Sequence, residues 1–304
     1  MKRNFWAFTI LFIAIVLMGF SYAPPQEPTA NVKVMTHNIW NGFNWGKDTI
    51  RKENWIRWIR GKNPDILALQ ELCGYTEEKL KADAAKWGHN YVKILKTEGY
   101  PTGLTSKKPI TIKGRVTEGL WHGLLHCATY GIDFFVVHLS PADCDFRLKE
   151  AYSIIEKVKN CKSDRYIILG DFNAHSPFDE ELLKHNRSLR TQYSKNNSNT
   201  YSNLRHGEFD YSVVSTFIAL PAIDVCIKFI DITDRYTYPS PVLIGSHRKT
   251  MDDVIKTRER IDYILASPVI SKSCTNVKIF NKGEAETLSD HYPIMAEFKI
   301  KLEN

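Results

Sequence analysis

The chain has 304 residues, of which 43% are hydrophobic and 12% aromatic, and it carries a formal net charge of +7 at pH 7. This composition excludes an intrinsically disordered protein, and the lack of an internal sequence repeat excludes solenoids and propellers. A single α/β or α+β globular domain remains, and its small positive charge suits an anionic substrate as well as it suits ordinary solubility.

Residues 1–23 have the pattern of a secretory signal, in which a short basic head precedes an uncharged run over residues 5–20. This run is shorter than the roughly 20 apolar residues that span a bilayer, so it favours a signal peptide, while retention as an N-terminal anchor stays open. Residues 24–31 are expected to form a short linker and residues 32–304 the folded domain. The sequence therefore predicts an exported protein that is periplasmic, extracellular or anchored on the outer side of a membrane.

The six cysteines show neither a Cys-x-x-Cys pair nor the spacing of zinc ligands. An exported protein can form disulfides, but a domain of this size does not need them for its stability. The sequence leaves the presence and the pairing of disulfides open.

The first elements of the folded domain are two strands with a helix between them. Residues 32–35 have the pattern of a strand that runs on to Asn38, and residues 52–60 place apolar side chains on one face of a helix. Residues 65–69 form a continuous apolar run, typical of a strand covered on both faces, and lead to Glu71. Both strands thus end beside a polar side chain that could bind a ligand.

The same arrangement recurs in the middle of the chain. Residues 132–137 predict an apolar strand that ends at His138, and residues 166–169 predict another that leads to Asp171. Between them, residues 147–158 repeat apolar side chains at helical spacing. One polar residue at a strand end is an ordinary turn residue, but the repetition favours a ligand site, because such sites lie at strand ends.

Two further strands are predicted at residues 261–265 and 294–300, and the second is entered through Asp290 and His291. Asp262 lies inside the first of these apolar strands. A buried carboxylate is costly unless it is paired. It could form a salt bridge with the neighbouring arginine, or it could hold a histidine in one tautomer.

Five motifs occur in this order: Thr36-His37-Asn38-Ile39-Trp40, Gln70-Glu71, Gly170-Asp171-Phe172-Asn173, Arg260-Ile261-Asp262-Tyr263 and Ser289-Asp290-His291-Tyr292-Pro293. Together they resemble the metal-dependent endonuclease/exonuclease/phosphatase superfamily. This superfamily includes pancreatic-type deoxyribonucleases, abasic-site endonucleases, neutral sphingomyelinases and inositol polyphosphate phosphatases. The resemblance covers about residues 32–301 and includes the segment 103–110, which looks like the strand after the Gln-Glu motif.

The resemblance implies an α/β fold, namely a four-layer α/β sandwich in which two central mixed β-sheets are flanked by helices. It places the site at the edge between the sheets. It also implies phosphoester hydrolysis by in-line attack of water with Mg²⁺ or Mn²⁺ as cofactor. Glu71 and Asp290 would offer hard oxygen ligands to such a metal, with Asn38 beside them.

The same resemblance implies the roles of the catalytic residues. Asp171 would orient or deprotonate the attacking water, and Asn173 and His138 would hold phosphate oxygens. Either His138 or a water on the metal could protonate the leaving group. His291, paired with Asp262, would act as a base or as a cationic clamp on the transition state. Residue type does not decide whether Asp171 or His291 accepts the proton.

Two further residues are candidates for substrate binding. Trp40, in a cluster of aromatic residues over 40–45, could stack on a base or lipid headgroup, although loop aromatics more often pack into the fold. Arg147 could reach an anionic substrate, but a solvated helix end is the favoured interpretation of this residue. His122 and His126 are interpreted as structural rather than catalytic.

The sequence says less about the substrate. The signature of inositol polyphosphate phosphatases is absent, and Trp40 stands where some abasic-site enzymes carry a carboxylate. The closing motif and the export signal look like those of secreted deoxyribonucleases, although the chain has no concentrated basic stripe. The polar segment 187–256 is the expected source of specificity.

We therefore expect an exported Mg²⁺- or Mn²⁺-dependent phosphodiesterase with nucleic acid as the leading substrate. The alternative is a phosphatase- or phospholipase C-like hydrolase of a small phosphorylated metabolite or lipid headgroup. A third hypothesis is a catalytically inactive surface binding protein on the same fold, against which the full set of catalytic residue types argues. No protein partner is implied, and a monomer is expected.

Overall fold

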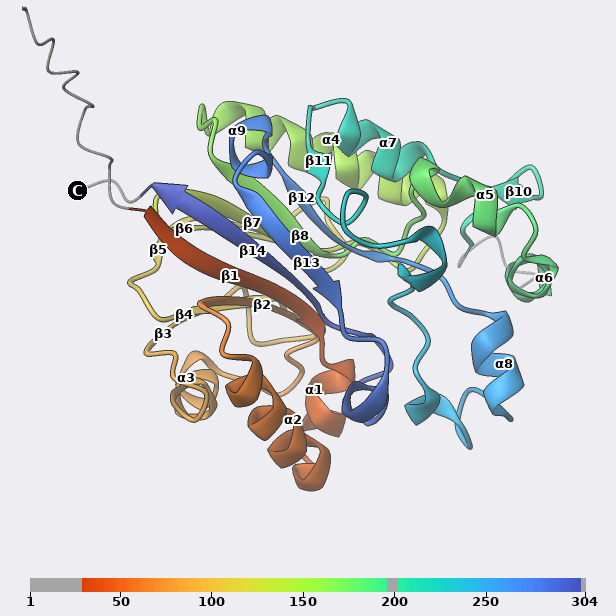
Figure 1. Ribbon diagram of the computed structural model, residues 1–304, viewed down its shortest axis with the longest axis horizontal. Coiled ribbons are helices and arrows are strands. Elements are labelled where there is room, and N and C mark those ends of the chain that lie inside the picture. Colours follow the sequence, from red (N-terminus) through yellow and green to blue (C-terminus); the bar gives the residue numbers. More distant parts are fainter. Residues whose placement is uncertain (1–28, 196–201, 302–304) are drawn as a thin grey trace, which may run out of the picture.

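The computed structural model describes residues 29–195 and 202–301 (Figure 1). Within them, two six-stranded mixed sheets pack face to face, and helices cover the outer face of each sheet. The four-layer α/β sandwich expected from the sequence is confirmed. The predicted signal over residues 1–23 and most of the predicted linker over 24–31 lie outside the described residues.

The first sheet has the strand order β13-β14-β1-β2-β4-β3, and its neighbours β1 and β2 are parallel. Its strands are β1 (Thr29–Asn38), β2 (Ile66–Gln70), β3 (Tyr91–Ile94), β4 (Gly103–Ser106), β13 (Cys274–Ile279) and β14 (Ile294–Lys301). The strands expected at residues 32–35, 65–69 and 294–300 are therefore present, and the first of them begins earlier than expected.

The second sheet has the order β11-β12-β8-β7-β6-β5, and here β7 and β8 are the parallel pair. Its strands are β5 (Thr111–Val116), β6 (Leu124–Thr129), β7 (Ile132–His138), β8 (Tyr166–Asp171), β11 (Ile223–Asp224) and β12 (Asp262–Ala266). The strands expected at residues 132–137, 166–169 and 261–265 are present as well.

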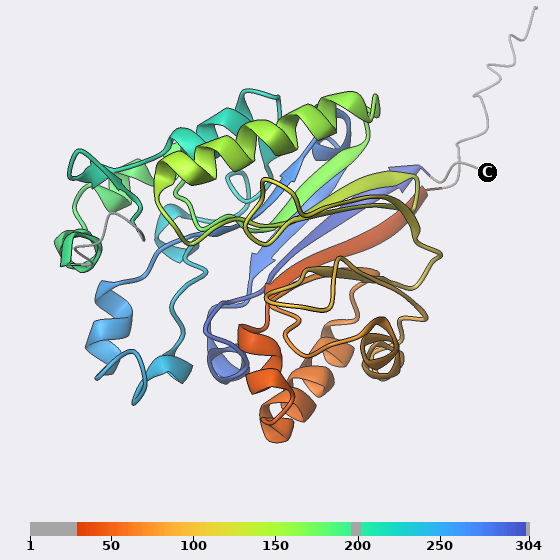
Figure 2. The same ribbon diagram turned by 180° about the vertical axis from the view of Figure 1, so that it is seen from behind.

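The longer helices form the two outer layers. On the first sheet lie α2 (Thr49–Lys62) and α3 (Glu77–Ala85), and on the second lie α4 (Cys144–Asn160) and α7 (Ser212–Ile218), as the view from behind in Figure 2 also shows. The smaller elements are α1 (Trp40–Trp45), α5 (Glu180–Leu183), α6 (Arg187–Lys195), the hairpin β9 (Leu204–Arg205) and β10 (Glu208–Phe209), α8 (Met251–Lys256) and α9 (Pro268–Ser271). Of these, α5, α6 and α8 project together from one end of the sandwich (Figure 1).

Alternation along the strands of the second sheet divides the core into two layers. Phe134, Leu169 and Ile264 join the core that the second sheet shares with the first. Phe135 and Ile168, which point to the opposite face, pack instead against α4 and α7. Strands buried on both faces explain the continuous apolar runs seen in the sequence.

All six cysteines lie within the described residues, and all are free thiols. In the same part of the chain, no helix is both long enough and apolar enough to cross a membrane.

Glu150 of α4 ties together two loops that border the strand ends. Its carboxylate, which is 1% exposed, accepts hydrogen bonds from the backbone N–H groups of Trp121 at 2.7 Å and Ser140 at 2.8 Å. Burial raises the pKa of Glu150 to about 7, although these two hydrogen bonds favour the ionised form.

This raised pKa predicts a pH dependence of stability. Because the folded state binds the Glu150 proton more tightly than the unfolded state, the free energy of unfolding should fall as the pH rises from about 4.5 through 7. Glu150→Gln should remove this contribution. The free energy of unfolding of wild type relative to the variant should therefore be lower at about pH 8 than at about pH 5. Urea denaturation at both pH values measures it, and an identical difference at the two values would contradict the prediction.

Candidate active site

Parallel strand pairs bring distant polar residues to one edge of the sandwich. In the first sheet, β1 and β2 align Asn38 with Gln70, so Asn38 and Glu71 leave the sheet side by side. In the second sheet, β7 and β8 align His138 with Asp171. Because both pairs end at the same edge, the four polar residues lie close together.

Antiparallel neighbours complete this cluster. The first residue of β12, Asp262, lies opposite Asp171, the last residue of β8. In the other sheet, Ile294 at the start of β14 lies opposite Thr36 near the end of β1, so His291 just before β14 reaches the same edge.

A cavity of about 520 Å³ opens at this edge. Eight of the predicted site residues line it, namely Trp40, Glu71, His138, Arg147, Asp171, Asn173, Asp290 and His291. The remaining two, Asn38 and Asp262, lie beneath it and bond to residues that do line it. The fold thus brings the whole predicted set together.

His291 lies between carboxylates. Its Nδ1 is 2.9 Å from Oδ2 of Asp262, and its Nε2 is 3.7 Å from Oδ2 of Asp171. Burial alone would lower the pKa of His291, but Asp262, Asp171 and Asp290 raise it well above its ordinary value. The ligand atoms of Asp171, Asp262 and His291 lie within 4.8 Å of one another, yet a protonated imidazole cannot bind a metal. The group is therefore better suited to charge pairing than to metal binding.

Asp171 is almost completely buried, and its pKa is raised to about 7. Burial is the main cause, and the Asp262 carboxylate adds to it, while His291 opposes it. The N–H of Asn173 donates to Oδ1 at 2.9 Å, and the amide of Asn38 donates to Oδ2 at 3.0 Å. A carboxyl group with a pKa near neutrality is suited to exchange a proton with water.

Glu71 and Asp290 form the part of the site that could hold a metal ion. Burial raises the pKa of both carboxyl groups, and the charge of Asp290 raises that of Glu71 further. The Asn38 amide donates to Oε1 of Glu71 at 3.1 Å, and the Asn41 N–H donates to Oε2 at 2.6 Å. The Asn38 Oδ1 accepts from the Trp40 N–H at 3.1 Å. Because hard cations prefer such oxygen donors and would relieve the repulsion between the two carboxylates, this set fits Mg²⁺ or Mn²⁺.

The backbone beside this site is a left-handed turn. All six residues of α1 have φ between 52° and 59°, and Glu71 has φ 60°. Each such residue other than glycine costs about 1–2 kcal/mol. A Cβ on Gly42 would lie 2.1 Å from the Cys73 carbonyl oxygen, so only glycine fits there. The turn aims the Asn41 N–H at Glu71.

Arg51 of α2 fixes this turn from below. Its buried guanidinium donates to the carbonyls of Ile39 at 2.9 Å, Trp40 at 3.0 Å and Leu288 at 3.1 Å. It also pairs with Asp48 at 3.1 Å. The Arg51 side chain thus joins the segment after β1 to the segment before β14, which carries Asp290 and His291.

Three histidines with lowered pKa values, His37, His122 and the predicted catalytic residue His138, lie at the site. Trp55 donates to Nδ1 of His37 at 2.9 Å, so Nε2 carries the proton and donates to the carbonyl of His291 at 3.1 Å. His122 stacks on His138 with ring centroids 3.9 Å apart. Burial lowers the pKa of His37 and of His122 to about 3, and that of His138 well below its ordinary value. His122, interpreted as structural from the sequence, lines the cavity.

Arg147 is 1% exposed, so the interpretation as a solvated helix end is wrong. Its guanidinium donates to the carbonyls of Ser140, Ala142 and Ser202 and to the side-chain oxygen of Asn203. Because these bonds join the loop after β7 to the segment before β9, Arg147 builds one wall of the cavity. Its contact with an anionic substrate stays a prediction.

Sequence reasoning missed several lining residues, among them Tyr100, Trp121, Gln192, Tyr193, Ser202, Asn203, Tyr238 and Glu259. Tyr193 donates to Glu259 at 2.8 Å, and His175 bonds the same carboxylate at 2.7 Å. No local pattern marks these residues. Many of them nevertheless belong to the segment 187–256 that was expected to set specificity.

Residues 35–291 of this chain match the sequence pattern of the Endonuclease/Exonuclease/phosphatase family. Among solved structures, an AP endonuclease from Archaeoglobus fulgidus is 20% identical, with a TM-score of 0.63 over 88% of this chain and 100% of that one. The 3'-5' exonuclease NExo from Neisseria meningitidis is 19% identical, with a TM-score of 0.63 over 88% of this chain and 100% of that one. The 3' phosphatase NExo from Neisseria, bound to product DNA hairpin, is 18% identical, with a TM-score of 0.61 over 88% of this chain and 99% of that one. These likenesses show the fold.

A curated relative, the uncharacterized protein F14F9.5 of Caenorhabditis elegans, is 33% identical over 95 residues, which are 30% of this chain. The match spans 28% of that relative's length.

The charge state of His291 can be measured directly in the metal-free protein. Because three carboxylates favour its protonated form, His291 should keep its proton well above its ordinary pKa of 6.5, while His37 and His122 stay neutral until about pH 3. Asp262→Asn should lower the pKa of His291, and the exposed Asp252→Asn should not. NMR titration of the histidine rings measures these values, and a neutral His291 at pH 7 in wild type would overturn the assignment.

Proposed function

The chain belongs to the endonuclease/exonuclease/phosphatase family of phosphoester hydrolases, and from this membership we propose a specific activity. The protein is a divalent-metal-dependent phosphodiesterase that is exported, acts as a monomer and has nucleic acid as its leading substrate. The observation that carries the proposal is the cluster of four carboxylates, Glu71, Asp171, Asp262 and Asp290, around His291 at the cavity. The composition of residues 1–23 supports export.

Charge balance supports the metal dependence. If all four carboxylates of this cluster are ionised, the His291 imidazolium balances one of them, and the Arg51 guanidinium is already paired with Asp48, so three negative charges stay without a paired cation. A divalent cation held by Glu71, Asp290 and Asn38 would balance two of these three charges. When bound, the metal would polarise a phosphoryl oxygen and neutralise charge on the leaving oxygen.

The remaining steps fall to side chains of this chain. His291 lies between two carboxylates, which favours its cationic form, so it acts as a clamp on a phosphate oxygen. Asp171, whose Oδ2 faces both Asn38 and His291, orients the attacking water and accepts its proton. Asn173 contributes an amide N–H, although its Nδ2 also bonds the Leu139 carbonyl at 3.0 Å.

The metal assignment can be tested by hydrolysis assays on the full chain with plasmid DNA, RNA and bis(p-nitrophenyl) phosphate, each with Mg²⁺, with Mn²⁺ and with a chelator. Wild type should hydrolyse nucleic acid only with metal. Glu71→Ala should abolish this activity, since it removes a metal ligand, and Asp171→Ala should abolish it by removing the base. Glu156→Ala, which removes an exposed carboxylate on α4, is the matched control and should retain it.

Other outcomes of these assays identify the alternatives. Turnover of small esters alone would replace nucleic acid with a phosphorylated metabolite or lipid headgroup as the substrate. Failure to bind either metal at millimolar concentration would favour an inactive surface binding protein. Wild-type turnover by Glu71→Ala would refute the metal site.

The role of His291 has a separate test. His291→Ala should lower kcat by a factor of about 10²–10⁴, because it removes a charged group at the reacting phosphate. The exposed His247→Ala is the control for loss of an imidazole. Steady-state kinetics on the small diester measures the change, and a rate within about twofold of wild type would exclude His291 from the mechanism.

A further inference from the structure

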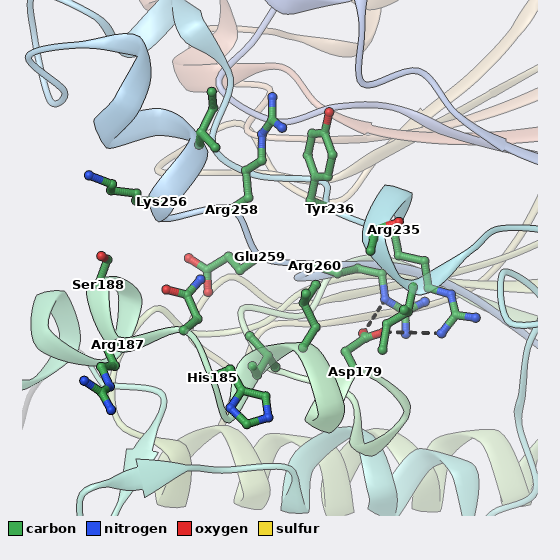
Figure 3. Close-up of a pocket in the computed structure, with 16 residues that line it drawn as sticks. Asp179, His185, Arg187, Ser188, Arg235, Tyr236, Lys256, Arg258, Glu259 and Arg260 are labelled. Carbon is green, nitrogen blue, oxygen red and sulfur yellow. Dashed lines mark hydrogen bonds and ion pairs between the residues drawn. The ribbon is translucent and has the colours of Figure 1, made fainter.

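A second cavity of about 490 Å³, whose lining Figure 3 shows, shares Glu259 with the active-site cavity. One side is formed by residues 179–188, which include α5 and the start of α6, and the other by residues 255–260 at the end of α8 and before β12. Figure 3 shows Lys256 and Arg258 on one side of this space and Arg187 on the other.

Cations outnumber carboxylates in this lining. It contains five basic side chains, Arg187, Arg235, Lys256, Arg258 and Arg260, and two carboxylates, Asp179 and Glu259. Asp179 is shared by Arg260 at 2.7 Å and Arg235 at 3.6 Å, and Lys256 pairs with Asp252. Among the described residues, Arg187 and Arg258 have no carboxylate partner, so two guanidinium groups keep their charge uncompensated.

Arg258 is positioned as an anion receptor. Its guanidinium carbon lies 4.1 Å from the centroid of the Tyr236 ring, and its buried Nε has no hydrogen-bond partner among the described residues. A guanidinium that stacks on an aromatic ring keeps its in-plane N–H donors available, and their geometry matches a phosphate.

The other walls are apolar. Leu182, Leu183, Ile232 and Ile255 line the cavity together with Tyr236. Leu182 is 42% exposed and Ile255 is 49% exposed, so these apolar side chains are accessible to a ligand in the cavity. A free phosphate would make no use of such walls, whereas a nucleotide would place its base or sugar on them.

The two cavities share a wall. Glu259 lines both, and its Oε2 is held by Tyr193 and His175. The two cavities are therefore adjacent, with the buried Glu259 carboxylate between them.

We propose that the basic cavity binds a backbone phosphate and the adjoining nucleotide of a nucleic-acid strand whose scissile phosphodiester lies in the active-site cavity. This inference rests on the proposed function. Arg258 and Arg187 contact the phosphate, and the apolar walls accommodate the base or sugar.

The test is equilibrium binding of a fluorescein-labelled single-stranded DNA of about 12 nucleotides to the full chain in chelator, followed by fluorescence anisotropy across a salt series. One lost phosphate contact should lower the slope of log affinity against log salt by about 0.7. We expect that decrease in Arg258→Ala and about twice as much in the double variant with Arg187→Ala. Arg258→Lys, which keeps the charge, should largely restore the slope. Arg60→Ala, which removes an exposed arginine of α2, should leave it unchanged.

An unchanged slope in the double variant would overturn the proposal, as would binding to vesicles of anionic phospholipid without binding to DNA. Circular dichroism checks folding, and the exposed Arg187→Ala alone serves if Arg258→Ala unfolds. Hydrolysis of bis(p-nitrophenyl) phosphate by wild type separates the two proposals. If wild type hydrolyses the ester and the salt slope of the double variant is unchanged, only the proposed phosphate subsite is refuted. If the slope decreases but wild type does not hydrolyse the ester, only the proposed activity is refuted.

Discussion

The structure depends on holding four carboxylates, Glu71, Asp171, Asp262 and Asp290, at one edge of two sheets and largely out of water. Desolvated like charges repel one another, so the charge of Asp290 raises the pKa of Glu71 and the charge of Asp262 raises the pKa of Asp171. The fold compensates with the imidazolium of His291 and with backbone and amide donors. This compensation is incomplete, which is the physical reason why the site suits a cation and an anionic substrate rather than a stabilising role.

The residues that position this carboxylate cluster have a strained backbone or a buried charged side chain. The left-handed turn α1 costs several kcal/mol in backbone conformation, since about 1–2 kcal/mol falls on each residue other than glycine. It persists because Arg51 binds two carbonyls at its start and Gly42 fits against Cys73. In return, the turn supplies a backbone donor to Glu71. Strain of this kind is typical of functional sites in which the surrounding structure over-determines the backbone.

The sequence predicted what depends on local pattern and chain order, and it failed where long-range packing decides. Apolar runs that end in polar residues located the strands, and the ordered motifs located the site. Arg51 was not singled out from the sequence, and the burial of Arg147, a candidate for substrate binding, was not expected, because only the tertiary fold buries these two charged helix residues. His122 was set aside because nothing in the sequence shows that β6 and β7 bring it onto His138. Tyr193 reaches the cavity from α6, and short-range signals do not determine where this short helix packs.

The two cavities differ in charge: carboxylates line the active-site cavity, and uncompensated arginines line the second one. A cluster of carboxylates repels a polyanion, and a metal ion at Glu71 and Asp290 would attract only the phosphate that it contacts. The uncompensated guanidinium groups of Arg187 and Arg258 lie beyond the shared wall at Glu259, where they would attract the rest of the proposed nucleic-acid strand without neutralising the catalytic carboxylates. Tyr193 and His175 hold the Glu259 carboxylate between the carboxylate cluster and the two arginines, so it separates these two charged regions. The attraction of an anionic substrate therefore depends on where the positive charges of the chain lie rather than on its modest net charge.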